Sequence, residues 1–199
     1  MDKRQQKTQA RLFETILDLA ASHPAAELTM SEIAAHAKVH RSTLYEHASS
    51  PADLLQSALR TELDVLRSQY LDDVSPADAA AAVRAVTLAV LQHIDEHAVI
   101  YARGLGSASE SASLHSMLAS HFRVSTKLLL EQHSLTIPFA VDGVDEETLG
   151  ETAAQYVAHG TVGAIEVWLR GPEPRHPSTF VAVFEKLIPS WWAGNSDVS

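Results

Sequence analysis

The chain has 199 residues and a mass of 21.6 kDa, enough for one large domain or two modest ones with a substantial core. It contains no cysteine, which excludes disulfides, thiolate metal sites and cysteine nucleophiles. The net charge is −10, but residues 1–60 carry seven basic and seven acidic side chains. The whole excess of negative charge therefore lies in residues 61–199, so the charge differs between the two parts of the chain.

The first residues are basic and polar, with Lys3, Arg4, Lys7 and Arg11 close together. They form no apolar signal-peptide core, and no apolar run of about 18 residues occurs anywhere in the chain. We therefore expect a cytoplasmic protein with no membrane partner. The basic segment suits a phosphate backbone, and the alternative interpretation is a frayed, solvated terminus.

A helix is predicted over residues 7–22, where apolar residues recur at helical spacing before Pro24 ends it. A second helix begins at Thr29, because Thr29 and Glu32 have the spacing of a capping box. Residues 38–40 then interrupt the helical period.

A third short helix follows from Arg41 to His47, with Leu44 buried and its neighbours facing outward. Two short helices that meet at a tight turn and lean on a third are typical of a helix-turn-helix.

Residues 11–55 resemble the DNA-binding domain of the TetR/AcrR family of bacterial transcriptional regulators. The matching residues are Ile16, Leu17, Ala20, Ala21, Thr29, Ile33, Ala34, Ala37, Val39, Thr43, Leu44, Tyr45 and Leu54. Lys38 stands where the family usually has a glycine, and Ala48 replaces an aromatic residue. A Cβ in a tight turn of positive φ costs about 1 kcal/mol. The resemblance implies an all-α chain with an N-terminal three-helix helix-turn-helix domain, residues 1–50, and a larger helical ligand-binding and dimerisation domain, residues 51–199.

The third helix carries the side chains suited to base edges. Arg41 can donate two hydrogen bonds to guanine, and Ser42 and Thr43 are short enough to contact neighbouring bases. The resemblance implies that Thr29, Tyr45 and His47 contact phosphates, although Tyr45 could instead be a half-buried packing residue. The expected DNA-binding residues are Thr29, Lys38, His40, Arg41, Ser42, Thr43, Tyr45 and His47.

Further helices follow to the C-terminus. Two of them are predicted to begin with the same chemistry, a serine cap, then proline, then an acidic residue two positions on. The predicted helices cover residues 51–71, 76–96, 97–105, 110–133, 146–170 and 179–192.

The helix over 146–170 is apolar on two sides, and two glycines on one side permit close approach of another helix. With the last helix it would form half of a four-helix homodimer interface, an arrangement that the resemblance also implies. The alternative is a monomer whose own core covers both sides. The candidate interface residues are Gly160, Gly163, Val167, Phe180, Phe184 and Leu187.

A ligand pocket is predicted around His121, which lies on an otherwise apolar helical stripe. The alternative is a hydrogen-bonded core histidine. His93 and His97 have the spacing of a helical metal pair, but eleven histidines make chance pairs common, so no metal site or cofactor is expected. The candidate pocket residues are His93, His97, Tyr101, His121, Phe122 and Tyr156.

These features predict a sequence-specific DNA-binding regulator that binds a palindromic operator as a homodimer and is relieved by an unknown small-molecule effector. No catalytic motif appears, so no enzyme is expected, and only scattered histidines favour one. The main alternative is a helical ligand-binding or protein-interaction module with a degenerate DNA-reading domain. Its basis is the neutral charge of residues 1–60, the missing turn glycine at Lys38 and the acidic Glu46.

Overall fold

The structure is a computed structural model that describes residues 3–106, 111–189 and 191–192. In these ranges it is helical, with no strand. The chain divides into two compact units, Met1–Glu62 and Leu63–Ser199, and the division falls inside one continuous helix. The predicted all-α fold class is confirmed.

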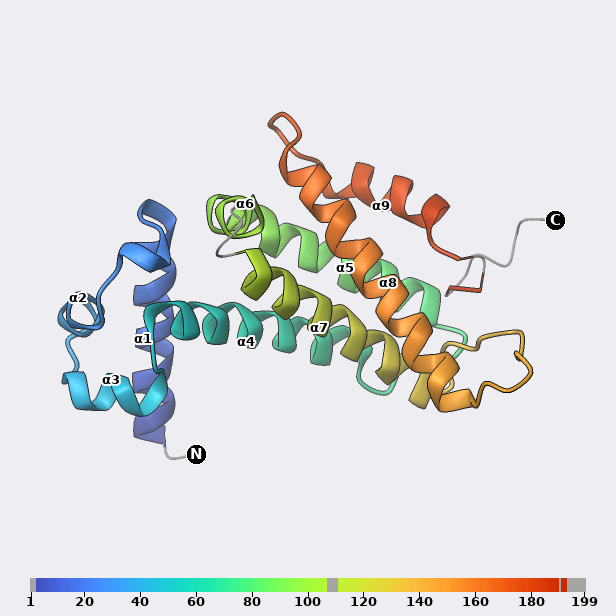
Figure 1. Cartoon of the computed structure of the whole chain (residues 1–199), viewed down its shortest axis with the longest axis horizontal. Helices are drawn as coiled ribbons and strands as arrows, with labels where there is room; N and C mark the ends of the chain where they lie inside the picture. Colours follow the sequence, from blue (N-terminus) through green and yellow to red (C-terminus); the bar gives the residue numbers. More distant parts are fainter. Residues whose placement is uncertain (1–2, 107–110, 190, 193–199) are drawn as a thin grey trace. The chain divides into compact units, whose positions relative to one another are not determined.

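The first unit contains α1 (Lys3–Ser22), a single 3-10 turn (Ala25–Glu27), α2 (Met30–His36), α3 (Arg41–His47) and the start of α4 (Pro51–Leu71) (Figure 1). Each helix contributes apolar side chains to one core, because none of the short helices could bury its apolar face alone. The fully buried side chains include Leu12, Ile16, Ile33, Leu44, Leu54 and Leu59.

The predicted capping box at the start of α2 is confirmed. The Thr29 hydroxyl accepts a hydrogen bond from the Glu32 amide at 3.2 Å, and the Glu32 carboxylate accepts one from the Thr29 amide at 2.9 Å. Hydrogen bonds from the Thr29 side chain, and then from its amide, lower the pKa of the Glu32 carboxyl. These reciprocal bonds fix where α2 begins and therefore where the turn before α3 falls.

The turn between α2 and α3 is closed by a Schellman motif centred on Lys38. The Val39 amide donates to the Ala34 carbonyl at 3.0 Å and the Lys38 amide donates to the Ala35 carbonyl at 3.2 Å. This pattern needs a left-handed residue after the helix, and Lys38 has a φ of 53°. The expected strain of a side chain at this position is therefore present in the fold.

Helix α4 begins as predicted, with Pro51 at its first position and the Ser50 hydroxyl accepting from the Asp53 amide at 3.1 Å. The division between the two compact units falls within this helix, after Glu62. The first three turns of α4 bury Leu54 and Leu59, so this part of the helix belongs to the first core.

The second unit contains the end of α4, α5 (Ala79–Glu96), α6 (Ala98–Gly106), α7 (Ser111–Glu131), α8 (Glu146–Leu169) and α9 (Pro177–Leu187). Helices α7 and α8 lie side by side in an extensive contact, while α9 packs on α5 (Figure 1). None of the described helices combines the length and apolarity that crossing a membrane requires.

Several helix bounds differ from the predicted ranges, and two of the differences have a clear local cause. Helix α5 begins at Ala79 because Ser75 and Asp78 first close a local turn, with their side-chain oxygens 2.7 Å apart. Helix α9 ends at Leu187 because Ile188 precedes a proline and adopts an extended conformation, with ψ of 153°.

The backbone of Lys38 generates the first prediction. Lys38→Gly should raise the free energy of unfolding by about 1 kcal/mol relative to Lys38→Ala, because lysine and alanine both hold a Cβ in the left-handed region. Urea unfolding of the two variants measures this difference. Both variants lack the lysine charge, so the effect of its loss cancels. Equal stability of the two variants would contradict the strain at this turn.

Candidate nucleic-acid interface and ligand pocket

The outward face of α3 presents most of the side chains predicted to contact DNA. Leu44 is fully buried and holds the helix to the first core, whereas Arg41 and Ser42 are exposed and Thr43 is half-buried. The remaining predicted residues also lie at the surface. His47 is half-buried, and the exposed ones are Thr29, Lys38, His40 and Tyr45. The structure therefore brings the predicted set onto the surface around one short helix.

Arg41 and Tyr45 face each other one turn apart on α3. The Arg41 guanidinium carbon lies 6.0 Å from the centre of the Tyr45 ring, at the outer limit of a cation–π contact. Tyr45 is 51% exposed, so it is a surface residue and not the half-buried packing residue of the alternative interpretation. The ring can orient the guanidinium and still offer its hydroxyl to a phosphate.

A polar groove of about 820 Å³ runs between α1 and the turn that leads into α3. Three basic residues of α1 line one wall, and Lys38 lies on the other with His40. Glu46 also lines the groove, so its charge is mixed. The basic residues of α1 in this groove are Arg4, Lys7 and Arg11. A phosphate backbone beside α3 would meet these cations within the same unit.

A separate pocket lies inside the second unit between α5, α7, α8 and α9. Its cavity is about 50 Å³, on the order of three to five water molecules, and among the described residues no lysine, arginine, aspartate or glutamate lines it. The lining residues are Leu71, Val83, Val86, Thr87, Val90, Leu91, His121, Phe122, Ser125, Thr126, Leu129, Val157, Thr161, Ile165, Phe180, Phe184 and Trp192.

The hydroxyl groups of this pocket already have partners in their own helices. Thr87 donates to the Val83 carbonyl at 2.7 Å and Thr161 to the Val157 carbonyl at 2.7 Å. Ser125 and Thr126 make the same bond, each to the carbonyl four residues earlier at 2.9 Å. The pocket is therefore less polar towards a guest than its four hydroxyl residues suggest.

His121 is the exception in this wall. It is 5% exposed, and among the described residues its Nδ1 is a buried atom without a hydrogen-bond partner. Burial, with smaller effects from the charges of Arg67 and His93, lowers the pKa of His121 to about 3. The imidazole is therefore neutral at physiological pH. The predicted alternative of a hydrogen-bonded core histidine does not describe this nitrogen.

Residues 12–58 match the family profile described as "Bacterial regulatory proteins, tetR family". The first unit carries a TetR-family helix-turn-helix. No curated protein is similar enough in sequence to match this chain.

Solved structures extend the likeness to the whole fold. The activator of the dihydroxyacetone kinase operon, DhaS, superposes with a TM-score of 0.61 at 15% identity, covering 91% of this chain and 96% of that one. A TetR regulator from Streptococcus agalactiae gives 0.60 at 16%, covering 94% and 96%. The TetR-family repressor FadR of Thermus thermophilus, solved with lauroyl-CoA, gives 0.60 at 16%, covering 90% and 92%. The chain thus has the fold of TetR-family transcriptional regulators.

In this TetR-family fold, α8 has one buried and one exposed apolar face. Ala154, Ala158 and Val162 are fully buried, whereas Tyr156 is 68% exposed and Val167 63% exposed. Tyr156, predicted for the pocket, therefore lies on the outer face. A Cβ at Gly160 or Gly163 would meet nothing within 4 Å, so neither glycine serves packing inside the described chain.

Two predicted dimer residues lie elsewhere. Phe180 and Phe184 are 7% and 9% exposed and line the pocket, because this side of α9 packs towards α5 and α8. The outer side of α9 instead presents Val183 and Leu187, which are 54% and 69% exposed. Sequence analysis selected Phe180, Phe184 and Leu187 together and did not distinguish the side of this helix that faces the core.

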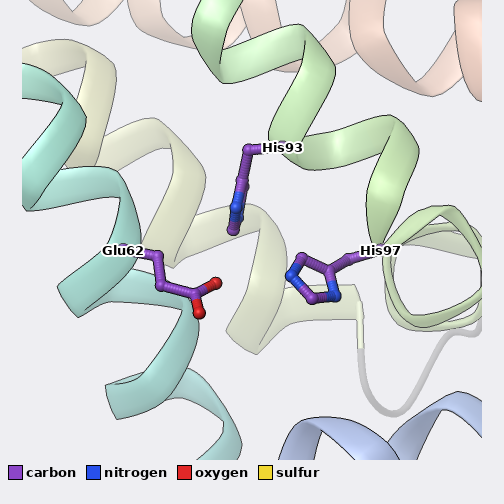
Figure 2. Close-up of side chains that lie close together, drawn as sticks. All are labelled: Glu62, His93 and His97. Carbon is purple, nitrogen blue, oxygen red and sulfur yellow. The ribbon is translucent and has the colours of Figure 1, made fainter. Parts of the chain in front are cut away.

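Of the six predicted pocket residues, only His121 and Phe122 line the pocket. His93, His97 and Tyr101 form a separate group, in which the His93 Nε2 lies 3.0 Å from the Tyr101 hydroxyl. Figure 2 draws His93 and His97 together with Glu62, a residue that sequence analysis did not select.

The buried His121 gives a pH prediction. Its pKa is lowered from 6.5 to about 3 in the folded chain, so below pH 6.5 the unfolded chain takes up a proton that the folded chain does not. Its contribution to stability is complete above pH 6.5 and falls by about 2 kcal/mol between pH 7 and pH 5. We expect His121→Leu to lose correspondingly less stability over this range, measured by urea unfolding. Phe122→Leu, in the same pocket, should keep the wild-type pH dependence; matching slopes in both variants would contradict the assignment.

Proposed function

We propose that this chain is a sequence-specific, homodimeric transcriptional regulator whose DNA binding is relieved by a small, uncharged ligand. The observation that carries this proposal is the exposed face of α3, with Arg41 and Ser42 at its start, on a TetR-family helix-turn-helix. Arg41 and its neighbours read bases in the major groove, while Lys38, Tyr45 and the basic residues of α1 contact phosphates.

The proposed dimer pairs the outer faces of α8 and α9 with those of a second copy. This face is apolar and exposed, and its two glycines leave room for a partner helix to approach closely. The revised interface is formed by Tyr156, Gly160, Gly163, Val167, Val183 and Leu187. Two copies would place two α3 helices in successive major grooves, about 34 to 36 Å apart on a pseudo-palindrome.

The proposed ligand is an apolar molecule with one hydrogen-bonding group such as a hydroxyl or carbonyl. Apolar side chains supply nearly all of the wall, and a charged ligand would lose its hydration without a counter-charge. The neutral His121 Nδ1 can bond the polar group of such a ligand. FadR, which has a similar fold, was solved in complex with lauroyl-CoA. That complex supports an apolar chain as part of the proposed ligand.

For a ligand to release the protein from DNA, the ligand must bind two arrangements of the dimer with different affinities. Helix α4 is continuous from the first unit into the second, so a shift of α4 on ligand entry is the proposed route. Distances between spin labels placed on α3 of the two protomers test this route with and without ligand. An unchanged separation would contradict it.

A second candidate function is a ligand-binding module whose helix-turn-helix no longer reads DNA. Glu46 favours it, since this exposed acid lines the groove beside Lys38 and would face phosphates. Selection of bound duplexes from a random library at about 0.15 M salt separates the two functions. An enriched palindrome supports the regulator, and a folded dimer that enriches no sequence supports the module.

The proposed DNA binding predicts different effects for substitutions of Arg41 and of Lys7. Arg41→Ala should cost about 1 to 3 kcal/mol on the selected operator and relax base choice at one position, because arginine bonds a guanine edge. Lys7→Ala should weaken all duplexes alike and reduce the salt dependence, because it removes one phosphate contact. Binding titrations at several salt concentrations measure both. Uniform loss on every sequence for Arg41→Ala would contradict its base-reading role.

The dimer proposal predicts that Val167→Asp converts the protein to monomer while the protomer stays folded. Val167 is 63% exposed in the protomer, so the aspartate is solvated there but would be buried unpaired in the dimer. Val99→Asp is the matched control, because Val99 is 55% exposed on α6, a helix that the proposed interface does not include. Sedimentation measures both; a dimeric Val167→Asp protein would contradict the interface.

A further inference from the structure

Two histidines and a glutamate form a chain of contacts between α7 and α8. His115 lies near the start of α7, and His159 and Glu166 lie on α8, so all three belong to the second unit. The His115 Nδ1 lies 3.1 Å from a Glu166 carboxylate oxygen, and the His115 Nε2 lies 3.3 Å from the His159 Nδ1. His159 is exposed and the other two are half-buried, so the group is reachable from solvent.

The packing of the two helices explains why these side chains meet. His159 and Glu166 are two helical turns apart, which places them on the same side of α8. Helices α7 and α8 are in extensive contact, so their backbones hold His115 opposite both residues. The rings of His115 and His159 are stacked, with 5.5 Å between their centres and 26° between their planes. The group therefore stands on two packed helices, which position side chains more precisely than loops do.

Glu166 determines which nitrogen of His115 carries the proton. A carboxylate only accepts hydrogen bonds, so the neutral imidazole of His115 carries its proton on Nδ1 and donates it to Glu166. The Nε2 of His115 then has a lone pair, and that lone pair is on the side of His159. Metal-binding histidines commonly have their other ring nitrogen bonded to a carboxylate in this way, because the bond sets the ring orientation.

We propose that the His115 Nε2 and the His159 Nδ1 bind one divalent transition metal ion of the zinc type, with Glu166 as a positioning residue. Zinc–nitrogen bonds of about 2.0 to 2.1 Å at tetrahedral angles place two ligand nitrogens roughly 3.3 to 3.4 Å apart, which matches their observed spacing. Small rotations of the two rings direct both lone pairs to one point. The proton of the His159 Nδ1 moves through water to the Nε2 of the same ring, and water fills the two remaining metal positions.

The charge of the second unit and the type of ligand atom both favour this class of metal. Residues 61–199 carry eight basic and eighteen acidic side chains, so the unit attracts divalent cations. Imidazole nitrogen suits zinc, copper and nickel, whereas magnesium and calcium prefer oxygen ligands. We therefore expect Zn²⁺ to bind in the presence of excess Mg²⁺.

The test is calorimetric titration of the full chain with Zn²⁺, with any affinity tag removed and Mg²⁺ present in excess. We expect one Zn²⁺ per chain to bind to the wild type, and this binding to be at least roughly tenfold weaker in His115→Gln and in His159→Gln. His159 is exposed, so its substitution should leave the fold intact. Urea unfolding of each variant without metal checks the fold.

A matched control comes from another histidine of the second unit. His97, at the C-terminal end of α5, has the spacing of a helical metal pair with His93 but belongs to a different group. His97→Gln should bind zinc as the wild type does. Absence of stoichiometric binding, wild-type affinity in folded His115→Gln and His159→Gln, or an equal loss in His97→Gln would each overturn the proposal.

The role of Glu166 has its own pair of variants. Glu166→Ala removes the acceptor from the His115 Nδ1 and should weaken zinc binding about tenfold. Glu166→Gln keeps an amide oxygen that can accept the same hydrogen bond, so it should recover part of the affinity. A purely structural role of Glu166 would change the unfolding of the metal-free chain and not this order of zinc affinities.

A bound metal would also join α7 to α8, the helix that carries the proposed dimer face. His159 directly precedes Gly160 of that face, so a consequence for dimer stability rests on the function proposed above. Sedimentation with and without Zn²⁺ measures that consequence, with His159→Gln as the reference. The calorimetric test counts ions per chain and needs neither DNA nor a dimer. Failure of zinc binding therefore leaves the proposed regulator standing, and failure of DNA binding leaves the metal site standing.

Discussion

The packing of α8 against α7 is the contact on which the second unit depends. It buries one apolar face of α8, and Val157, Thr161 and Ile165 of that helix then form a wall of the pocket. Tyr156 and Val167 point away from this buried face and remain exposed. The pocket and the proposed dimer interface are thus two sides of one helix, so a ligand that shifts α8 can alter both.

The chemistry of the pocket follows from what its hydroxyl groups do inside their own helices. Serine and threonine in a helix can bond the carbonyl one turn earlier, which removes their protons from competition for a guest. Four lining residues do so, including Thr87 and Ser125. The partnerless nitrogen of His121 then dominates the polarity of the wall, and its low pKa keeps it uncharged. The residue types that line the pocket are partly polar, but the groups that remain available to a guest are nearly all apolar.

Sequence signals predicted the features that are local. Thr29 with Glu32, and Ser50 with Pro51, mark helix starts through contacts within four residues, so both were predicted correctly. The side of a helix that faces the core was harder to predict. Helices α8 and α9 each carry apolar residues on two sides, and only tertiary packing selects the inner one.

The strain at Lys38 links the fold of the first unit to its proposed role. Glycine would satisfy the Schellman turn without a Cβ in the left-handed region, so lysine costs the fold about 1 kcal/mol. The same side chain lines the groove that holds Lys7 and Arg11, where an added cation strengthens attraction to a phosphate backbone. The side chain of Lys38 therefore lowers the stability of the turn and adds a positive charge at the point where α2 leads into α3. Glu46, in the same groove, opposes this field, so affinity for DNA depends on the balance between these neighbouring charges.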